Sequence, residues 1–518
     1  MYVPLTILDF LDRAATVYSD RTAVVDEPGT PGSMGSMTYG DLDARARGMA
    51  ITLGEMGVGI GDRVAIVSPN SARFMVSFFG VSGYGRVLVP INYRLGPDEI
   101  RYIVEHSGAS VLLIDPESEA NVAGIDVKHR ILLNGSSDVE LFSPVGPGRP
   151  REPDHWDPDE AATASINYTS GTTARPKGVQ ITHRNCWLNA TVFGWHVNVS
   201  DRDVYMHTLP MFHCNGWGMP YAVTAMGVPQ IVVRKIDGEE ILRRIGDHGV
   251  TLLCGAPAVV AAVLDAAGSR REAGRPIPGR DQIRMVVAGA PPPSKTIERV
   301  ETELGWEFIQ IYGLTETSPL LTINRRRSEW DGSGPAELSK RLSHAGVPAV
   351  GVQIRTSPDG EVLARSNHVF DGYWHQKAET DKVIVDGWFH TGDEGRIVDG
   401  NYLSISDRKK DVIISGGENI SSVEVEDCLY QHPAVAEVAV IGVPSERWGE
   451  TVKALVVLRP GEDANESQII EFCRGRLAHF KCPTSVEFVD ALARTATGKL
   501  QKFKLRAPYW EGYERKVN

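Results

Sequence analysis

The sequence predicts a mixed α/β fold in a chain of several domains, and three observations lead to this class. Short apolar runs alternate with helix-like stretches from Asp62 onward, and the same rhythm returns after Ser165. This βαβα alternation is typical of parallel sheets covered by helices. The chain has 518 residues. At roughly 100 to 200 residues per domain, a single core is improbable for that length.

The first set of elements is expected between residues 62 and 114. It comprises strands and helices in alternation, at 64–67, 71–81, 87–91, from Pro97, and at 111–114. A second set with the same rhythm is expected further along the chain, at 231–233, 239–248, 251–254, 285–288 and 308–311. Together the two sets predict two doubly wound sheets in one large domain.

Past Val347 the pattern changes to short alternating strands with turn signals, at 351–354, 361–364 and 402–405. These predict a small β-barrel-like unit that closes the large domain. Two polar segments rich in Gly, Pro and charged residues, 271–282 and 325–343, are expected to be surface loops.

A charged run at 407–411 separates this part from a final segment of α+β pattern. Ser421 and Glu424 fit a capping box at the start of a helix. Strands at 435–441 and 452–458 and a helix at 467–477 follow. A separate domain of about 110 residues is therefore expected.

Charge and cysteine usage argue against several classes of protein. Acidic residues outnumber basic ones, 66 to 54, which gives a net charge of -12 and a pI near 5.7. No global positive field is present to hold a nucleic acid or an anionic membrane, and no apolar run predicts a membrane span. The six cysteines lack zinc-site spacing and indicate free thiols in a reducing compartment. Nothing at the start resembles a signal peptide, so a cytoplasmic protein is expected.

The clearest chemical signal is the segment 168–178, which follows a strand-like run and reads YTSGTTARPKG. Its hydroxyl groups, backbone amides and lysine can all turn toward phosphate oxygens, so a polyphosphate is the expected ligand. The segment is not a Walker A motif, because Pro176 and Gly178 stand where that motif needs glycine and a hydroxyl residue. A P-loop NTPase is thereby excluded.

This loop resembles the phosphate loop of the adenylate-forming (ANL) superfamily, which includes acyl-CoA synthetases, peptide-synthetase adenylation domains and beetle luciferases. Further blocks resemble the family in its own order: 288–291 (AGAP), 312–317 (YGLTET), 387–393 (GWFHTGD), 407–411 with 415–419, and 494–499 (RTATGK). The resemblance covers the whole chain. It implies an ATP-dependent acyl-CoA ligase that makes an acyl-AMP and then the CoA thioester. It also implies an AMP-binding domain at 1–406, a hinge at 407–411 and a mobile domain at 412–518.

The resemblance assigns the phosphates of ATP to one set of residues: Thr169, Ser170, Gly171, Thr172, Thr173 and Lys177. Attack of a carboxylate on the α-phosphorus brings two anions together and expels pyrophosphate, so cations and oriented donors are needed there. Glu316, next to Thr315 of the cofactor site, matches the family's Mg²⁺ ligand and is a catalytic candidate. The implied cofactors are therefore ATP, Mg²⁺ and CoA.

The nucleoside is assigned in the same way. A short run in this chain resembles the wall on which adenine lies in the family: Gly289, Ala290 and Pro291. Tyr312 resembles the opposite stacking face, with Gly313 beside it. Asp393 resembles the aspartate that accepts both ribose hydroxyls, and Arg408 resembles the arginine that joins it there.

The C-terminal domain is implied to serve the site in two postures. Lys499 matches the lysine that lies between the acyl carboxylate and the α-phosphate during adenylation, and it is the main catalytic candidate. Gly416, Gly417 and Glu418 resemble the loop that admits the pantetheine arm of CoA. Both cannot face one site at once, so the family rotates this domain about a hinge, here Lys410.

The acyl pocket is assigned to the block 211–217, with Phe212, His213 and Trp217 as pocket residues and Gly313 on its border. His213 is also a catalytic candidate, and the alternative is a packed histidine oriented by hydrogen bonds. The acid itself stays open among medium-chain, aryl, branched and polycyclic carboxylates.

Two positions depart from the family pattern. Ala174 stands where the phosphate loop usually carries glycine, and Ala493 stands where proline usually precedes the last block. One alternative is therefore an enzyme that mainly converts a supplied acyl-adenylate into the thioester. Another is an adenylating enzyme that loads a carrier protein. An oxygenase of the luciferase kind and a binding-only protein are further alternatives without a positive feature. A homodimer is a base-rate expectation.

Overall fold

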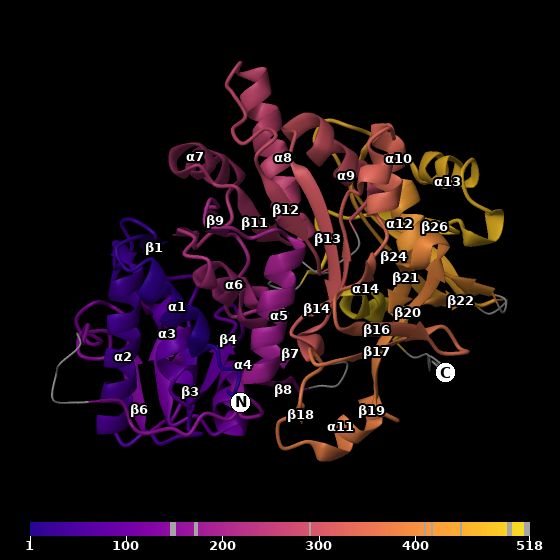
Figure 1. Cartoon of the computed structure of the whole chain (residues 1–518). Coiled ribbons are helices and arrows are strands. Elements are labelled where there is room, and N and C mark those ends of the chain that lie inside the picture. Colours follow the sequence, from indigo (N-terminus) through magenta and orange to yellow (C-terminus); the bar gives the residue numbers. More distant parts are fainter. Residues whose placement is uncertain are drawn as a thin grey trace.

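The computed structural model describes residues 1–145, 152–169, 175–289, 292–408, 411–415, 418–445, 448–494 and 500–511. The strands of these residues form four sheets. Figure 1 shows two large sheets beside each other, around β3 and β4 and around β11 to β13, with the last part of the chain set apart on one side. The predicted mixture of doubly wound sheets and a small final α+β unit is confirmed.

The first large sheet has seven strands in the order β18-β8-β7-β4-β3-β5-β6, and β7, β4, β3, β5 and β6 run parallel. All the elements predicted between residues 62 and 114 are present. The strands of this sheet are β3 (Arg63–Val67), β4 (Val87–Ile91), β5 (Val111–Ile114), β6 (His129–Leu132), β7 (Thr163–Thr169), β8 (Lys177–Thr182) and β18 (Gly372–Tyr373).

The second large sheet has nine strands in the order β15-β14-β13-β12-β11-β9-β10-β1-β2. Its inner strands are parallel, and antiparallel strands close both edges. The strands are β1 (Thr22–Val25), β2 (Ser36–Thr38), β9 (Tyr205–His207), β10 (Gln230–Val232), β11 (Leu252–Gly255), β12 (Arg284–Val287), β13 (Glu307–Gly313), β14 (Leu320–Asn324) and β15 (Val347–Pro348).

Helices separate and cover these sheets in an αβαβα stack. The shared core takes alternate residues of both sheets, such as Val64 and Leu252, together with α1, α2, α3, α5 and α6. The neighbouring residues Ala65 and Leu253 face the outer layers, where α4 covers the first sheet and α7 to α9 cover the second. The helices are α1 (Leu8–Val17), α2 (Tyr39–Glu55), α3 (Ala72–Ser82), α4 (Pro97–Ser107), α5 (His183–His196), α6 (Met219–Ala225), α7 (Gly238–His248), α8 (Pro257–Glu272) and α9 (Ser294–Arg299).

Strand membership does not follow chain order. β1 lies near the N-terminus but pairs with β10 in the second sheet, whereas β7 pairs with β4 in the first. The alternating pattern identifies each strand because it depends on local hydrophobicity. It does not identify the sheet, because that depends on pairing between residues far apart in the chain.

The third sheet is antiparallel and supports the ribose-binding candidate Asp393. Its strands are β16 (Val352–Thr356), β17 (Glu361–Ser366), β19 (Ile384–Val385), β20 (Trp388–Val398) and β21 (Tyr402–Arg408), with α11 (Lys377–Val383) between β18 and β19. The expectation of a surface loop at 325–343 is wrong in part, because this segment contains α10 (Pro335–Leu342). Leu338 and Leu342 of α10 are buried, and their i,i+4 spacing is the helical signal that the polar composition obscured.

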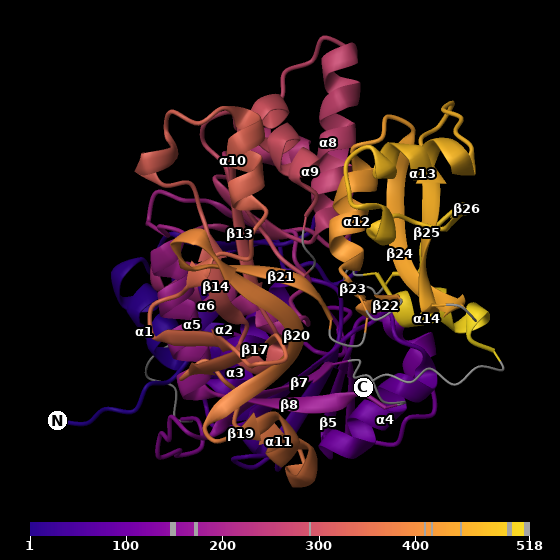
Figure 2. The same ribbon diagram turned by 90° about the vertical axis from the view of Figure 1, so that its right-hand side faces the viewer.

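The last unit has its own sheet and core. Its strands are β22 (Ile413–Ser415), β23 (Glu418–Ile420), β24 (Val435–Ser445), β25 (Gly449–Leu458) and β26 (Ser485–Phe488), and its helices are α12 (Ser422–Tyr430), α13 (Glu466–Arg474) and α14 (Lys502–Arg506). The predicted N-cap is present, since the Ser421 hydroxyl accepts the backbone N–H of Glu424 at 3.2 Å. Figure 2 shows this unit beside α8 and α9 of the large domain.

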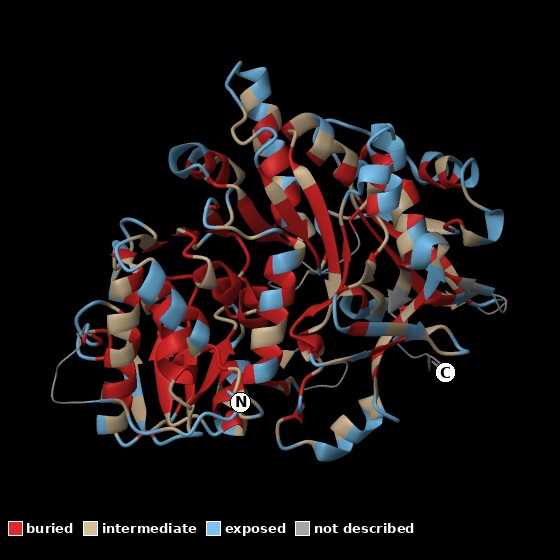
Figure 3. Ribbon diagram, viewed as in Figure 1, coloured by how far each residue is buried: buried red, intermediate tan, exposed pale blue. Residues whose placement is uncertain are grey.

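Burial follows the same layers. In Figure 3 the central strands of the large sheets are buried, and the outer faces of α7, α10 and α13 are exposed. Within the described ranges, no helix is both long and apolar enough to cross a membrane.

Candidate active site

The predicted phosphate loop joins two paired strands. β7 ends at Thr169 and β8 begins at Lys177, and these two residues are opposite each other in the antiparallel ladder. Both therefore lie at the mouth of the loop. The other predicted loop residues, Ser170, Gly171, Thr172 and Thr173, lie outside the described residues, as does Ala174.

The Lys177 ammonium is held by two residues that the sequence did not indicate. Its Nζ lies 2.6 Å from Oε2 of Glu379 and 4.9 Å from the centre of the Tyr373 ring. Hydrogen bonds from Lys177 and then from Lys382 lower the pKa of Glu379 to about 2, so this carboxylate is ionised at neutral pH. The lysine is thus positioned at the loop by an ion pair and a cation–π contact.

Tyr373 also contacts the predicted metal ligand. Its hydroxyl donates to Oε1 of Glu316 at 2.9 Å, and the backbone N–H of Phe370 donates to the Glu316 carbonyl at 2.8 Å. Glu316 lies in a short helical turn after β13, next to the buried Thr315. One tyrosine therefore brings together the lysine and the carboxylate that were predicted from separate blocks.

The two predicted nucleoside residues are joined directly. The Tyr312 hydroxyl donates to Oδ2 of Asp393 at 2.7 Å, and Asp393 is only 4% exposed. Its backbone N–H donates to the Thr391 hydroxyl at 3.1 Å. Arg408 is opposite Asp393 in the β20–β21 ladder, and its role at the ribose stays a prediction. The Tyr312–Asp393 hydrogen bond was not predicted, because the sequence suggested only a stacking role for Tyr312.

The glycines of the predicted adenine site differ from each other. Gly289 follows β12 with φ +95°, and a side chain at this position would be strained although no atom lies within 4 Å of it. Gly313 is required by packing, because an added Cβ would lie 1.5 Å from the carbonyl oxygen of Pro319. Ala290 and Pro291 lie outside the described residues.

The block assigned to the acyl pocket follows β9. Phe212 and Trp217 are buried, and the Phe212 ring packs edge-on against Tyr93 at 5.8 Å. His213 is half-buried and accepts the backbone N–H of Gly216 through its carbonyl at 3.0 Å. Residues 214–218 form a turn with left-handed backbone angles, a feature that the sequence did not predict.

The predicted residues of the C-terminal domain are described only in part. Glu418 is exposed at the start of β23, opposite Ser415 of β22. Lys499, Lys410, Gly416 and Gly417 lie outside the described residues, so their assigned roles stay predictions.

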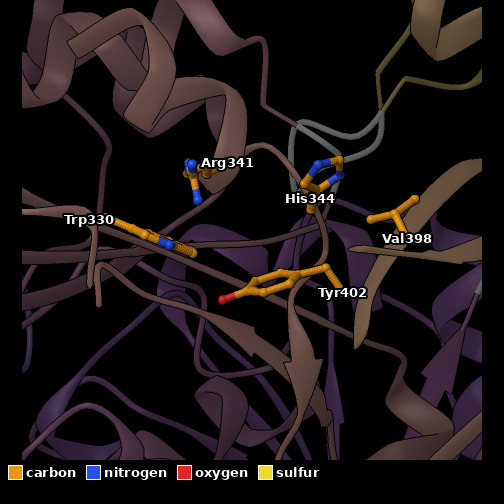
Figure 4. A pocket seen from close by; sticks show the side chains of 5 residues that line it. All are labelled: Trp330, Arg341, His344, Val398 and Tyr402. Carbon is orange, nitrogen blue, oxygen red and sulfur yellow. The ribbon is translucent and has the colours of Figure 1, made fainter. Parts of the chain in front are cut away.

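A cavity of about 320 Å³ lies elsewhere, between α10 and the far end of the β20–β21 hairpin. Five residues line it, and Figure 4 shows two of them, Trp330 and Tyr402, as an aromatic pair with the other three beside it. The guanidinium of Arg341 lies over Trp330 at 5.4 Å, and that of Arg327 lies over Tyr402 at 5.0 Å. None of the predicted site residues that the structure describes lines this cavity.

Comparison with known families agrees with this geometry. The profile described as AMP-binding enzyme matches residues 11–374, and the profile of the AMP-binding enzyme C-terminal domain matches residues 424–499. The chain belongs to the AMP-binding enzymes. These profiles and the curated relatives place it among the acyl-CoA synthetases of the adenylate-forming superfamily.

Three curated relatives align over nearly the whole of this AMP-binding enzyme. A 2-methylpropanoate–CoA ligase of Humulus lupulus is 36% identical, covering 97% of this chain and 95% of the relative. A 4-hydroxybutyrate–CoA ligase of Metallosphaera sedula is 35% identical over 98% and 94%, respectively. A probable peroxisomal acyl-activating enzyme of Arabidopsis thaliana is 34% identical over 97% and 95%.

A solved structure shows the same fold. An anthranilate CoA ligase in complex with anthranoyl-AMP superimposes with a TM-score of 0.85 at 27% identity, covering 98% of each chain. The AMP-binding enzyme described here is therefore an ATP-dependent acid–thiol ligase, which makes an acyl-AMP and then the CoA thioester.

Proposed function

We propose that this ligase activates a short-chain aliphatic carboxylic acid. The observation that carries the proposal is the aromatic packing at the assigned acyl pocket, where Trp217 is 4% exposed and Tyr221, on the following helix α6, is 1% exposed. The Tyr221 ring contacts Phe78 at 5.5 Å and Phe79 at 5.8 Å, so this side of the pocket is filled with aromatic rings. Two of the relatives are named for methylpropanoate and hydroxybutyrate, which supports an acid of this size.

The residues assigned to the nucleotide suit the first half-reaction. A carboxylate oxygen attacks the α-phosphorus of ATP, and the bond to the pyrophosphate oxygen breaks. In this proposal Lys177 exchanges Glu379 for phosphate oxygens and screens the phosphates, and Asp393 holds the ribose together with Tyr312. In the second half-reaction the CoA sulfur attacks the acyl carbon and AMP leaves.

Magnesium fits Glu316. Among the described residues no group of three or more His, Cys, Asp or Glu could hold a metal ion. Mg²⁺ bound with ATP needs only one or two carboxylates together with phosphate oxygens, and Glu316 with the neighbouring Thr315 supplies that donor set. When bound there, the ion would neutralise part of the charge on the phosphates.

The two-posture scheme belongs to the same proposal, with domains at 1–406 and 412–518 and the hinge at Lys410. It places Lys499 in the site during adenylation and residues 416–418 there during thioester formation. A cytoplasmic location, a dimer and a carrier protein as an alternative acceptor stay predictions, and three of the curated relatives are named as peroxisomal.

A release assay over a panel of acids tests the substrate class. AMP release is measured with CoA and with acetate, butyrate, 2-methylpropanoate, 4-hydroxybutyrate, trans-cinnamate and decanoate. We expect kcat/KM for the best short acid to exceed that for cinnamate or decanoate by at least about tenfold. A preference for decanoate or cinnamate contradicts the proposal.

A pocket variant sharpens this test. Trp217 has φ +61°, a conformation that glycine adopts without strain, so Trp217→Gly removes the ring and keeps the turn. We expect it to raise kcat/KM for decanoate relative to butyrate. Trp195→Ala removes an exposed tryptophan of α5 and serves as the matched control, with no expected change in this ratio.

A further inference from the structure

The turn at residues 214–218 has an unusual backbone that something must hold in place. Its φ angles are 46° at Cys214, 51° at Asn215, 59° at Gly216, 61° at Trp217 and 77° at Gly218. Left-handed angles in succession are unfavourable for residues that carry a Cβ atom, because the Cβ approaches the following carbonyl. The turn lies directly after His213 and carries Trp217, so its shape decides how both reach the assigned acyl pocket.

A closed ring of hydrogen bonds holds the first half of the turn. The Ser165 hydroxyl donates to Oδ1 of Asn167 at 2.9 Å, Nδ2 of Asn167 donates to Oδ1 of Asn215 at 3.1 Å, and Nδ2 of Asn215 donates to the Ser165 hydroxyl at 2.8 Å. All three residues are at most 2% exposed. Each group donates once and accepts once within the ring, and hydrogen bonds closed in this way strengthen one another in a buried site.

A second asparagine holds the other half. Nδ2 of Asn189 on α5 donates to the Trp217 carbonyl at 3.0 Å, and its Oδ1 accepts the backbone N–H of Leu320 on β14 at 3.1 Å. Asn189 is fully buried. A Cβ at Gly218 would lie 2.4 Å from Nδ2 of Asn189, so glycine is needed there for this contact.

The ring connects the turn to the phosphate side of the site. Ser165 and Asn167 lie on β7, which ends at Thr169, directly before the predicted phosphate loop. On its other side the turn approaches the metal-ligand block, where the Cys214 sulfur lies 4.0 Å from the Thr315 carbonyl. The turn that carries the assigned acyl-pocket residue Trp217 thus contacts both the strand before the phosphate loop and the block of the predicted metal ligand.

We propose that Ser165, Asn167 and Asn215 are positioning residues that fix the acyl pocket relative to the phosphate loop, so that the carboxylate is presented to the α-phosphorus. Their side chains are buried and bond to one another, so the proposed role is to position the residues of the site. The inference rests on the assignment of His213 and Trp217 to the acyl pocket. A purely structural ring is the competing explanation, and it predicts a change in stability without a selective change in acid binding.

A matched pair of serine variants separates the two explanations. Ser165→Ala opens the ring. Ser82→Ala is the matched control. Ser82 lies on α3, and its equally buried hydroxyl donates at 2.7 Å to the carbonyl of Ala164, which precedes Ser165 on β7 and is not part of the ring. We expect Ser165→Ala to raise KM for the best acid of the panel about tenfold and to change KM for ATP less than threefold. Ser82→Ala should leave both KM values within about twofold, with a similar shift in Tm.

Asn215→Gly gives a second test if Ser165→Ala does not fold. Glycine keeps the left-handed backbone but removes the amide from the ring, so the same rise in KM for the acid is expected. Asn167→Asp keeps an acceptor for the Ser165 hydroxyl and should restore part of the loss relative to Asn167→Ala. Equal KM values in Ser165→Ala, Asn215→Gly and Ser82→Ala overturn the inference. If the unmodified enzyme turns over no acid of the panel, the proposed substrate class fails instead.

Discussion

The junction between the two large sheets and the junction with the C-terminal domain differ in chemistry. The junction between the two large sheets is buried and charged. Arg234, after β10, places both guanidinium Nη atoms 3.0 Å from the carboxylate of Asp115, after β5. Asn70 of the first sheet donates to the carbonyls of His207, Leu209 and Val233 at 2.9 to 3.2 Å.

The junction between the large domain and the C-terminal domain contains hydrogen bonds between partly exposed groups. Asp427 of α12 accepts the backbone N–H of Ser294 at 2.9 Å and its hydroxyl at 3.2 Å. The Ser421 hydroxyl donates to the Ser406 carbonyl at 2.5 Å. Among the described contacts across this junction, these are hydrogen bonds and not buried ion pairs of the Arg234–Asp115 kind.

The two junctions are expected to differ in how easily they separate. A buried ion pair is costly to break, because one partner is then left as an uncompensated charge. A hydrogen bond at a partly exposed junction is exchanged for water at little net cost. This contrast supports the proposal that the residues assigned to the nucleotide belong to a fixed body and that the C-terminal domain changes its place.

The largest expected effect tests whether the C-terminal domain supplies a catalytic lysine for adenylation. Lys499→Ala should slow exchange of labelled pyrophosphate into ATP by about a thousandfold, or about 4 kcal/mol, because a cation at the α-phosphate is lost. Thioester formation from preformed acyl-AMP should be spared. Lys504→Ala, an exposed lysine of the same segment, is the matched control. Equal loss of both half-reactions contradicts the scheme.

The next prediction compares the stability of the two junctions by changing one carboxylate to an amide in each. Asp115→Asn should lower the free energy of unfolding of the large domain by about 3 kcal/mol, since Arg234 loses its buried carboxylate. Asp427→Asn should lower it by less than about 1 kcal/mol. Urea unfolding followed by tryptophan fluorescence measures both. Similar midpoints for the two variants remove the contrast between the junctions.

A smaller effect is expected within the fixed half. Asp393→Asn weakens an acceptor for the ribose and the bond from Tyr312, and it should raise KM for ATP about thirtyfold, or about 2 kcal/mol. Asp386→Asn, on an exposed turn of the same sheet, should leave KM unchanged. An unchanged KM in Asp393→Asn removes this residue from the nucleotide site.

The smallest effect concerns the exchangeable contact itself. Asp427→Ala should shift the ratio of the two half-reaction rates about threefold, because one posture loses the hydrogen bonds that Ser294 donates across the junction. Ser294→Ala removes the hydroxyl part of the same contact and should shift the ratio in the same direction. Combining the two should add little, and full additivity of the two shifts shows that they do not act through one contact.

Much of the fold could be predicted because strands such as β3 and helices such as α3 are encoded by local hydrophobic periodicity. The sheet to which β1 or β7 belongs could not be read in this way, because strand pairing is a long-range property. The site was predicted from motifs, and the Tyr312–Asp393 bond brings two of them together. The roles of Tyr373, Glu379 and Asn215 were missed, since each acts through contacts that are made only in the folded chain.

The two-posture scheme is tested most directly at its hinge. Lys410→Pro fixes φ near −65° at that position and removes the backbone N–H, so rotation there is restricted. The rates of pyrophosphate exchange and of thioester formation from preformed acyl-AMP are measured on the same preparation. We expect one half-reaction to stay within about threefold of the unmodified enzyme and the other to fall at least about a hundredfold. A variant in which both rates are unchanged, or fall by the same factor, contradicts the scheme.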